Sequence, residues 1–301
     1  MTDHDPRASA QGLEFLRRLE NWAATDVSTT TAAARDVLLA HLRAEQAANG
    51  DNGLVHQLAA RALDVATSDL QGGVSPADLR LHLAQSCVAE RTDLEAARAA
   101  VARTATALVP QSGAWIGTLG GSSTVALALL ELQRRGRGPR ALVAEGRPLL
   151  LGRELATTLT SAGVPTWLVV DGALPMLLSQ ATDLWLGAAA VTDRGAIVPV
   201  GGYAAALAAR EHSVPVHVLA PRRRFLPATT AALRIEETTP DEVWPDATAS
   251  GVRARSVRVE MLPLELVRGV VVEDGVLGAS EAATVARERA LPDPLADAPS
   301  R

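Results

Sequence analysis

The chain has 301 residues, of which 48% are hydrophobic and 21% are charged, and its formal net charge is −5. This length is enough to bury a sizeable core and allows one large domain or two ordinary ones. The negative charge gives no general attraction to nucleic acid or anionic lipid, so neither is expected as a partner. All 29 basic residues are arginine, which excludes Schiff-base catalysis and a P-loop because both need a lysine.

A single cysteine, Cys87, excludes an internal disulfide and a multi-cysteine metal site. His212 and His217 lack metal-ligand spacing and are interpreted as structural, so no metal or cofactor is expected. The first residues are polar and acidic, unlike a signal peptide, and no apolar run reaches 18 residues. We therefore expect a cytoplasmic protein that does not cross a membrane.

Residues 1 to about 107 are predicted to form a helical N-terminal domain. Apolar residues recur at three- and four-residue spacings in several stretches, which is typical of amphipathic helices. Residues 49–53 and Gly72-Gly73 separate these helices, and Ser75-Pro76 is a typical helix start.

From residue 108 to about 288, short apolar runs alternate with amphipathic helices. The runs are apolar on both faces, as the strands of a buried parallel sheet are. This alternation predicts an α/β fold with a Rossmann-like, doubly wound, mainly parallel sheet. The polar stretch 234–258 is predicted to be a loop or an edge excursion, and 289–301 a disordered tail.

Ligands of such sheets bind beyond the carboxyl ends of the strands, where five motifs of this chain fall. The first motif is Gly120-Gly121-Ser122-Ser123-Thr124, between a strand and a helix. Glycines let the backbone approach a ligand, and the N–H groups of a first helical turn favour anions. The motif is equally well a tight turn in which Ser122 or Ser123 caps the helix.

The second motif combines Glu145, Arg147 and Arg153, and the third is Asp171 at the end of the next strand. A guanidinium at a strand end can donate paired hydrogen bonds to a phosphate, while Glu145 orients it or binds a hydroxyl. Asp171 can accept from sugar hydroxyls. The alternatives are an internal ion pair for the second motif and a helix cap for the third.

Two further motifs follow later strands. Residues 187–193 are almost wholly apolar and offer shape rather than acid–base chemistry, with Asp193 in a turn. The three arginines Arg222, Arg223 and Arg224 at a strand end could bind a phosphate or an acidic partner, or lie in a solvated loop, and Arg222 is the predicted phosphate contact.

The order of these motifs resembles a family that includes methylthioribose-1-phosphate isomerase, ribose-1,5-bisphosphate isomerase and the α, β and δ subunits of translation initiation factor 2B. The strongest match is Glu145-Gly146-Arg147-Pro148 with Gly152, which resembles the family's Glu-x-Arg-Pro-x-x-x-Gly. Further matches cover most of the chain: Ala162-Gly163-Val164-Pro165, Asp171-Gly172-Ala173, Gly187-Ala188, residues 212–216, Leu219-Ala220-Pro221, residues 262–267 and residues 273–276.

This sequence departs from the family at the catalytic positions. Where the isomerases have a cysteine after the first strand this chain has Gly120, and where they have the aspartate of Gly-Ala-Asp it has Ala189. The family's Asn-Lys pair is also missing, with Pro199-Val200 nearby. Neither side chain can transfer a proton, and general acid–base catalysis contributes roughly 10²–10⁴-fold. The resemblance therefore implies a site without the catalytic pair.

The resemblance implies a non-catalytic, regulatory protein that binds a phosphorylated sugar or nucleotide and forms a homodimer or higher oligomer. Its predicted ligand-binding residues are Gly120, Gly121, Ser122, Ser123, Glu145, Arg147 and Asp171, with Arg153 and Arg222 as further phosphate contacts. Two alternatives stay open. One is an isomerase-like enzyme that uses Ser122, Ser123, Asp171 or Asp193, and the other is an oligomeric scaffold with a vestigial pocket.

Overall fold

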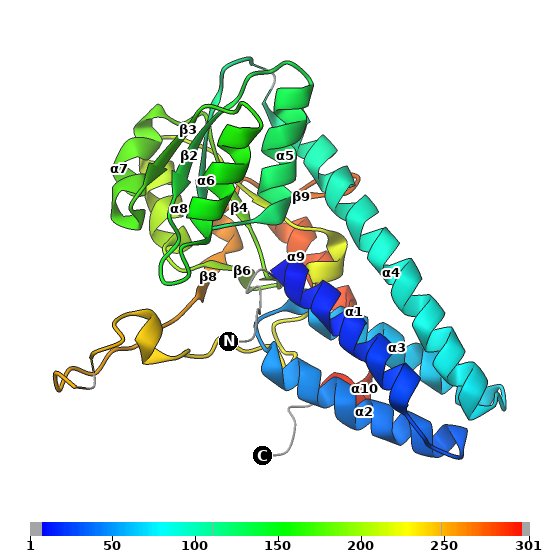
Figure 1. Ribbon diagram of the computed structural model, residues 1–301. Coiled ribbons are helices and arrows are strands. Elements are labelled where there is room, and N and C mark those ends of the chain that lie inside the picture. Colours follow the sequence, from blue (N-terminus) through cyan, green and yellow to red (C-terminus); the bar gives the residue numbers. More distant parts are fainter. Residues whose placement is uncertain (1–7, 110, 248, 297–301) are drawn as a thin grey trace.

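The computed structural model describes residues 8–109, 111–247 and 249–296. Four helices form a bundle at one end of the molecule (Figure 1): α1 (Ala8–Thr25), α2 (Thr31–Ala48), α3 (Gly53–Gln71) and α4 (Pro76–Ala105). Capping residues fix where they begin, because Thr30, Asn52 and Ser75 each accept a hydrogen bond from a first-turn N–H group. The predicted helical N-terminal region is confirmed.

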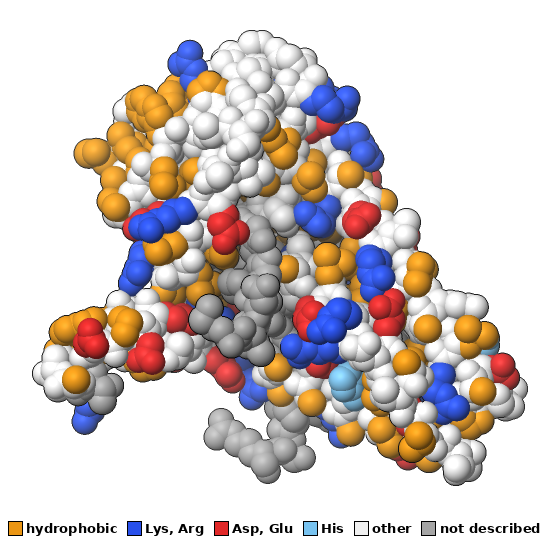
Figure 2. All heavy atoms as spheres, in the orientation of Figure 1, with side chains coloured by type: hydrophobic (Ala, Val, Ile, Leu, Met, Phe, Trp, Pro, Cys, Tyr) orange, Lys and Arg blue, Asp and Glu red, His pale blue; other side chains and the backbone are white. Residues whose placement is uncertain are grey.

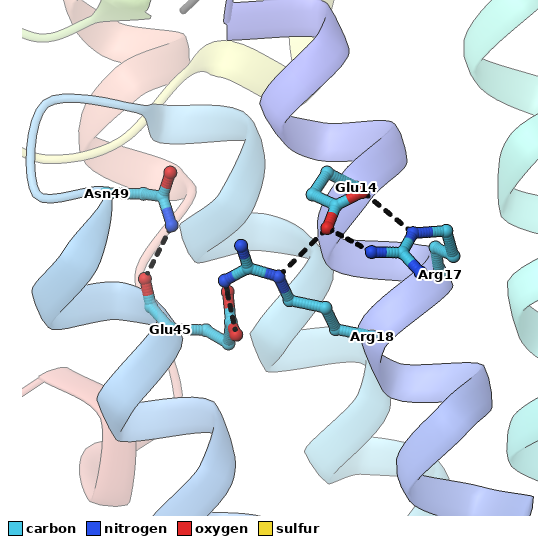
Figure 3. Close-up of polar contacts among 5 residues, drawn as sticks. All are labelled: Glu14, Arg17, Arg18, Glu45 and Asn49. Atoms are coloured by element: carbon cyan, nitrogen blue, oxygen red, sulfur yellow. Dashed lines mark hydrogen bonds and ion pairs between the residues drawn. The ribbon is translucent and has the colours of Figure 1, made fainter. Parts of the chain in front are cut away.

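The bundle is held by an apolar core and by ion pairs between α1 and α2. Phe15, Leu38 and Leu83 are buried where the helices meet, and Cys87 is buried with them. Figure 3 shows Arg18 between Glu14 of its own helix and Glu45 of α2, with a nitrogen–oxygen distance of 3.1 Å to each carboxylate. These contacts fix the end of α2, from which the chain enters the 49–53 loop.

The second part of the fold is a seven-stranded sheet of order β10-β9-β7-β4-β1-β2-β3. Its strands are β1 (Trp115–Leu119), β2 (Arg140–Ala144), β3 (Thr166–Val169), β4 (Asp183–Gly187), β7 (Val216–Leu219), β9 (Gly269–Val272) and β10 (Gly275–Leu277). Neighbouring strands are parallel except for the antiparallel β9–β10 pair. The predicted mainly parallel, doubly wound sheet is therefore confirmed.

Helices cover both faces of this sheet. One face carries the end of α4 together with α5 (Ser123–Arg134) and α6 (Leu151–Ser161). The other face carries α7 (Leu174–Leu177), α8 (Gly202–Glu211) and α9 (Ala279–Glu288). Short 3₁₀ turns, Asp171–Ala173 and Leu178–Gln180, flank α7 on its two sides.

Three further strands form a separate antiparallel sheet of order β5-β6-β8, which the sequence did not predict. They are β5 (Ala190–Val191), β6 (Gly195–Pro199) and β8 (Val259–Pro263). A parallel connection needs a crossover of a dozen or more residues, whereas a tight turn joins β5 to β6 directly. Thr192 closes that turn, because its hydroxyl donates to the Gly195 carbonyl at 2.8 Å. This small sheet forms one side of the site.

The prediction of a disordered tail is wrong for residues 289–296. Residues 297–301, the rest of that predicted tail, lie outside the described part of the chain. The short helix α10 (Asp293–Ala296) lies against α2 and α3, and Leu291 and Leu295 are buried in the bundle core. The helical unit is thus completed by residues from the far end of the sequence. No helix within the described ranges is long and apolar enough to cross a membrane.

Candidate functional site

A cavity of about 270 Å³ lies where the sheet, the helical bundle and a protruding segment meet. We call that segment, residues 229–247 and 249–258, the arm; Figure 1 shows it extending from the body of the molecule. The cavity opens beyond the carboxyl ends of β1 and β4, where the strand order reverses and sheets of this type bind ligands. Its lining comes from α1, the 49–53 loop, residues 120–124, 146–149, 187–189 and 197–199, Arg224 and the arm.

The glycine-serine turn after β1 forms one wall of the cavity. Gly120 has a φ of +70°, which a glycine adopts without strain, and Ser122 caps α5 by accepting from the Val125 N–H group at 3.3 Å. Ser123 instead donates its hydroxyl to the Ser9 hydroxyl of α1 at 3.2 Å. The N-cap alternative is thus observed for Ser122, and the whole predicted motif lines the cavity.

Residues 145–153, which we call the β2 corner, hold most of their charges in internal contacts. The two Asp171 carboxylate oxygens accept from the N–H groups of Gly146 and Arg147, each at 2.7 Å. The Arg147 guanidinium donates to two arm carbonyls, those of Glu242 at 3.2 Å and Val243 at 3.1 Å. Arg147 therefore lines the cavity while it fastens the arm, and Asp171 shapes the loop.

The expected pairing of Glu145 with Arg147 is not what the structure shows. Glu145 instead forms an ion pair with Arg153, at 2.8 Å. Glu145, Arg153 and Asp171 all lie outside the cavity lining. Arg147 and Arg153 are both close to Glu145 in the sequence, and their spacing could not show which of them pairs with it. The structure pairs Glu145 with Arg153, which lies on α6.

Residues 220–226 form a second corner, the β7 corner, which contains three consecutive arginines. Arg222 pairs with Asp274 at 2.9 Å and lies outside the cavity lining, contrary to the expected phosphate contact. Arg223 pairs with Glu90 and with Asp93. Arg224 turns inward, is 4% exposed, and lines the cavity.

Only Arg222 of the three arginines was named as a phosphate contact, yet it is Arg224 that lines the cavity. Its guanidinium donates to the Ser9 hydroxyl at 2.8 Å and to the Ala189 carbonyl at 3.4 Å. Burial, together with the positive charge of Arg98, lowers its pKa to about 10, so it stays charged at neutral pH.

The arm and the 49–53 loop supply further lining residues that the sequence did not single out. Arg234 pairs with Glu236 at 3.4 Å, and Arg258 pairs with Glu242. Burial raises the pKa of the Asp51 carboxyl, which also lines the cavity. The loop was identified only as a helix break and the arm only as an excursion, so no local signal pointed to their roles.

Gly120 and Ala189, which the sequence resemblance places at the two catalytic positions, both line the cavity. Asp193 does not, and its carboxylate accepts from the Ala228 N–H group at 2.7 Å. Within the described ranges, no group of three or more histidine, cysteine, aspartate or glutamate side chains could hold a metal ion. The polar side chains of the cavity lining include guanidinium and hydroxyl groups, together with the carboxylates of Asp51, Glu236 and Glu237.

Comparison with known proteins identifies the family of the chain. A sequence profile of the Initiation factor 2 subunit family matches residues 24–279. The chain belongs to this family. Among curated relatives, a probable bifunctional methylthioribose-1-phosphate isomerase/methylthioribulose-1-phosphate dehydratase of Nocardia farcinica is 38% identical over 166 residues, which cover 52% of this chain and 30% of the relative. The chain spans about half or less of the curated relatives that it matches.

Solved structures show that the family fold extends over nearly the whole chain. Translation initiation factor eIF-2B of Pyrococcus horikoshii matches with a TM-score of 0.76 at 21% identity, covering 91% of this chain and 93% of that one. The tetrameric eIF2B-beta2-delta2 complex of C. thermophilum contains a chain that matches with a TM-score of 0.66 at 19% identity, covering 94% and 89%. At these identities the likeness establishes the fold alone.

Proposed function

We propose that this family member binds a phosphorylated sugar or nucleotide in the cavity and does not isomerise it, acting as a regulatory protein. The observation that carries the proposal is a cavity at the strand-order switch that is lined by Arg147, Arg224 and the N-terminal turn of α5. Guanidinium groups and first-turn N–H groups are the donors that proteins use for phosphate.

The non-catalytic part of the proposal rests on Gly120 and Ala189, neither of which can transfer a proton. We expect the purified protein not to isomerise methylthioribose 1-phosphate or ribose 1,5-bisphosphate. Turnover of either compound at about 1–10³ s⁻¹, the usual range for enzymes, would overturn this part.

Binding is tested by the ligand-induced rise in melting temperature across a panel of phosphorylated sugars and nucleotides. The matched controls are the same sugars and nucleosides without phosphate. We expect stabilisation by one or more of the phosphorylated compounds and none by its control. If no phosphorylated compound stabilises the protein, the alternative of a scaffold with a vestigial pocket is favoured.

One observation favours an enzyme as the second candidate. A carboxyl with a raised pKa is suited to general acid–base work near neutral pH, and Asp51 lines the cavity with such a shift. Ser122, Asp171 and Asp193 are each engaged with backbone N–H groups. If turnover of any sugar phosphate is found, Asp51→Asn should abolish it, whereas retained turnover would exclude Asp51.

We also propose that two copies of the chain associate through the sheet domain. β3 is an edge strand of the sheet, and around it Trp167, Leu168, Val170 and Met176 are about half exposed or more. Figure 2 shows hydrophobic side chains gathered over the part of the surface where Figure 1 labels β3 and α7. An apolar patch beside an unpaired strand edge is typical of a protein interface.

Light scattering across micromolar concentrations should give a dimeric mass for the wild type and a monomeric mass for Leu168→Arg. Val88→Arg is the matched control, because Val88 is 58% exposed on α4, away from this patch. A monomeric mass for the wild type would contradict the proposal.

A further inference from the structure

The Arg224 side chain is a buried cation that has no acidic partner among the described residues. Its described hydrogen bonds go to one hydroxyl and one carbonyl, both uncharged, and none of the carboxylates in the described ranges forms an ion pair with it. Arg222 and Arg223, the residues directly before it, each pair with carboxylates. Of these three consecutive arginines, the one that lines the cavity is thus the one without a carboxylate partner among the described residues.

Burying a charge is costly unless it is paired, and most buried arginines are paired with an acid. The surrounding structure nevertheless secures this one. Gly53 lets α3 begin against the β7 corner, since a side chain there would place its Cβ 2.7 Å from the Arg224 carbonyl oxygen. The Gly53 N–H group and Arg224 both donate to the Ala189 carbonyl. A buried cation that is held in place beside a cavity, without a carboxylate partner among the described residues, is available to an anion that enters the cavity.

Other donors around Arg224 suit the same anion. The Ser9 hydroxyl accepts from Arg224 and from Ser123, so Ser9 can direct its own proton into the cavity. Ser123 and Thr124 begin α5, a helix of 12 residues whose first-turn N–H groups favour an anion. Gly187, at the end of β4, leaves room for this turn, because a Cβ there would lie 2.1 Å from the Ser122 hydroxyl oxygen.

We propose that Arg224 binds the anionic group of the ligand, a tetrahedral oxyanion such as a phosphate monoester, together with Ser9, Ser123 and the first turn of α5. This inference rests on the function proposed above and deepens it. It assigns the phosphate to the β7 corner and leaves Arg147 at the outer wall, where it fastens the arm.

The test uses inorganic phosphate as the probe, with sodium chloride at matched ionic strength as the salt control. Calorimetry should show phosphate binding to the wild type and a loss of affinity of roughly ten- to a hundredfold in Arg224→Met. Arg222→Met is the matched control, because it removes a neighbouring arginine that pairs with Asp274 outside the cavity, and it should bind phosphate like the wild type. Equal affinity in Arg224→Met and the wild type would overturn the inference.

Arg224→Lys and a selenate soak keep the inference testable if the methionine variant does not fold. The lysine variant keeps the charge but loses the planar fork, so it should fold and still bind phosphate more weakly than the wild type. An anomalous peak within hydrogen-bond distance of Arg224 in wild-type crystals would support the inference, and peaks only at other arginines would contradict it.

The two proposals fail in different ways. If a phosphorylated sugar or nucleotide binds Arg224→Met as tightly as the wild type, the proposed function stands and the role of Arg224 fails. If inorganic phosphate binding depends on Arg224 but no phosphorylated sugar or nucleotide binds, the anion site stands and the proposed function fails.

Discussion

The β2 and β7 corners both follow parallel strands and both contain arginine, yet their charges are used in opposite ways. At the β2 corner Glu145 pairs with Arg153, and Arg147 is exposed and bonded to the arm. At the β7 corner Arg224 is buried, faces the cavity and lacks a carboxylate partner among the described residues. A strand-end position therefore brings a charge near a site, but its tertiary partners decide whether the charge remains available to a ligand.

The largest expected effect concerns the rigidity of the β2 corner. In Gly152→Ala the new Cβ would lie 2.0 Å from the Ala144 carbonyl oxygen, a backbone atom that cannot move aside cheaply. We expect a loss of about 3 kcal/mol or more in the free energy of unfolding, measured by urea denaturation. Gly172→Ala is the control, because no heavy atom lies within 4 Å of its Cβ position. A loss below about 1 kcal/mol for Gly152→Ala would mean that the β2 corner is not rigid.

The second prediction concerns pH and the loop that packs on the β7 corner. His56 lies beneath this loop, and its ring nitrogens contact Gln46 at 3.1 Å and the Gly50 carbonyl at 3.3 Å. Burial lowers its pKa from 6.5 to about 4, and the nearby positive charge of Arg234 contributes. Between these values the unfolded chain takes up a proton that the folded protein does not, so stability falls as pH falls.

This difference corresponds to as much as about 3 kcal/mol between pH 6.5 and pH 4. His56→Gln should be less stable at pH 7 but should show a flatter dependence of unfolding free energy on pH in this range. His212→Gln, which replaces an exposed histidine at the end of α8, should keep the wild-type slope. An unchanged slope in His56→Gln would assign the acid sensitivity to other groups.

The third prediction concerns a carboxylate placed near Arg224 while the arginine itself is left unchanged. Ala189→Asp adds a carboxylate to the lining of the same cavity, next to the carbonyl that Arg224 contacts. An internal carboxylate competes with an external oxyanion, so phosphate affinity should fall by roughly ten- to a hundredfold. Ala189→Asn has nearly the same shape without the charge and should bind phosphate better than the aspartate variant. Equal affinities in the two variants would show that charge at residue 189 does not matter.

The smallest effect is expected for the exposed ion pair of the β2 corner. The Arg153 side chain is 57% exposed, and pairs of this kind contribute about 0–1 kcal/mol. Arg153→Ala should therefore change the unfolding free energy by less than about 1 kcal/mol and leave phosphate affinity at the wild-type value. A clear loss of phosphate affinity would return Arg153 to the binding site and weaken the contrast between the corners.

Local sequence patterns predicted those helices, strands and turns that depend mainly on neighbouring residues in the sequence. The strand–helix alternation, the helix starts at Ser75 and Ser122 and the glycine-serine turn follow from propensities and capping, and the structure has them. The separate β5-β6-β8 sheet was not predicted, because β8 pairs with β6 although the two strands are far apart in the sequence, with the arm between them. The partners of Glu145, Arg147 and Arg224 were missed for the same reason, since each depends on which distant element the fold brings near.

The return of the chain to the helical bundle has a consequence for synthesis on the ribosome. The Gln46 side chain donates to the Leu295 carbonyl at 3.4 Å, and these residues are 249 positions apart. At about 5–20 residues per second, roughly 12–50 seconds pass between their incorporation. During that interval the surface of α2 and α3 that Leu291 and Leu295 later cover remains uncovered by these residues. The bundle is the first part of the described chain to be made, and among the last to be completed.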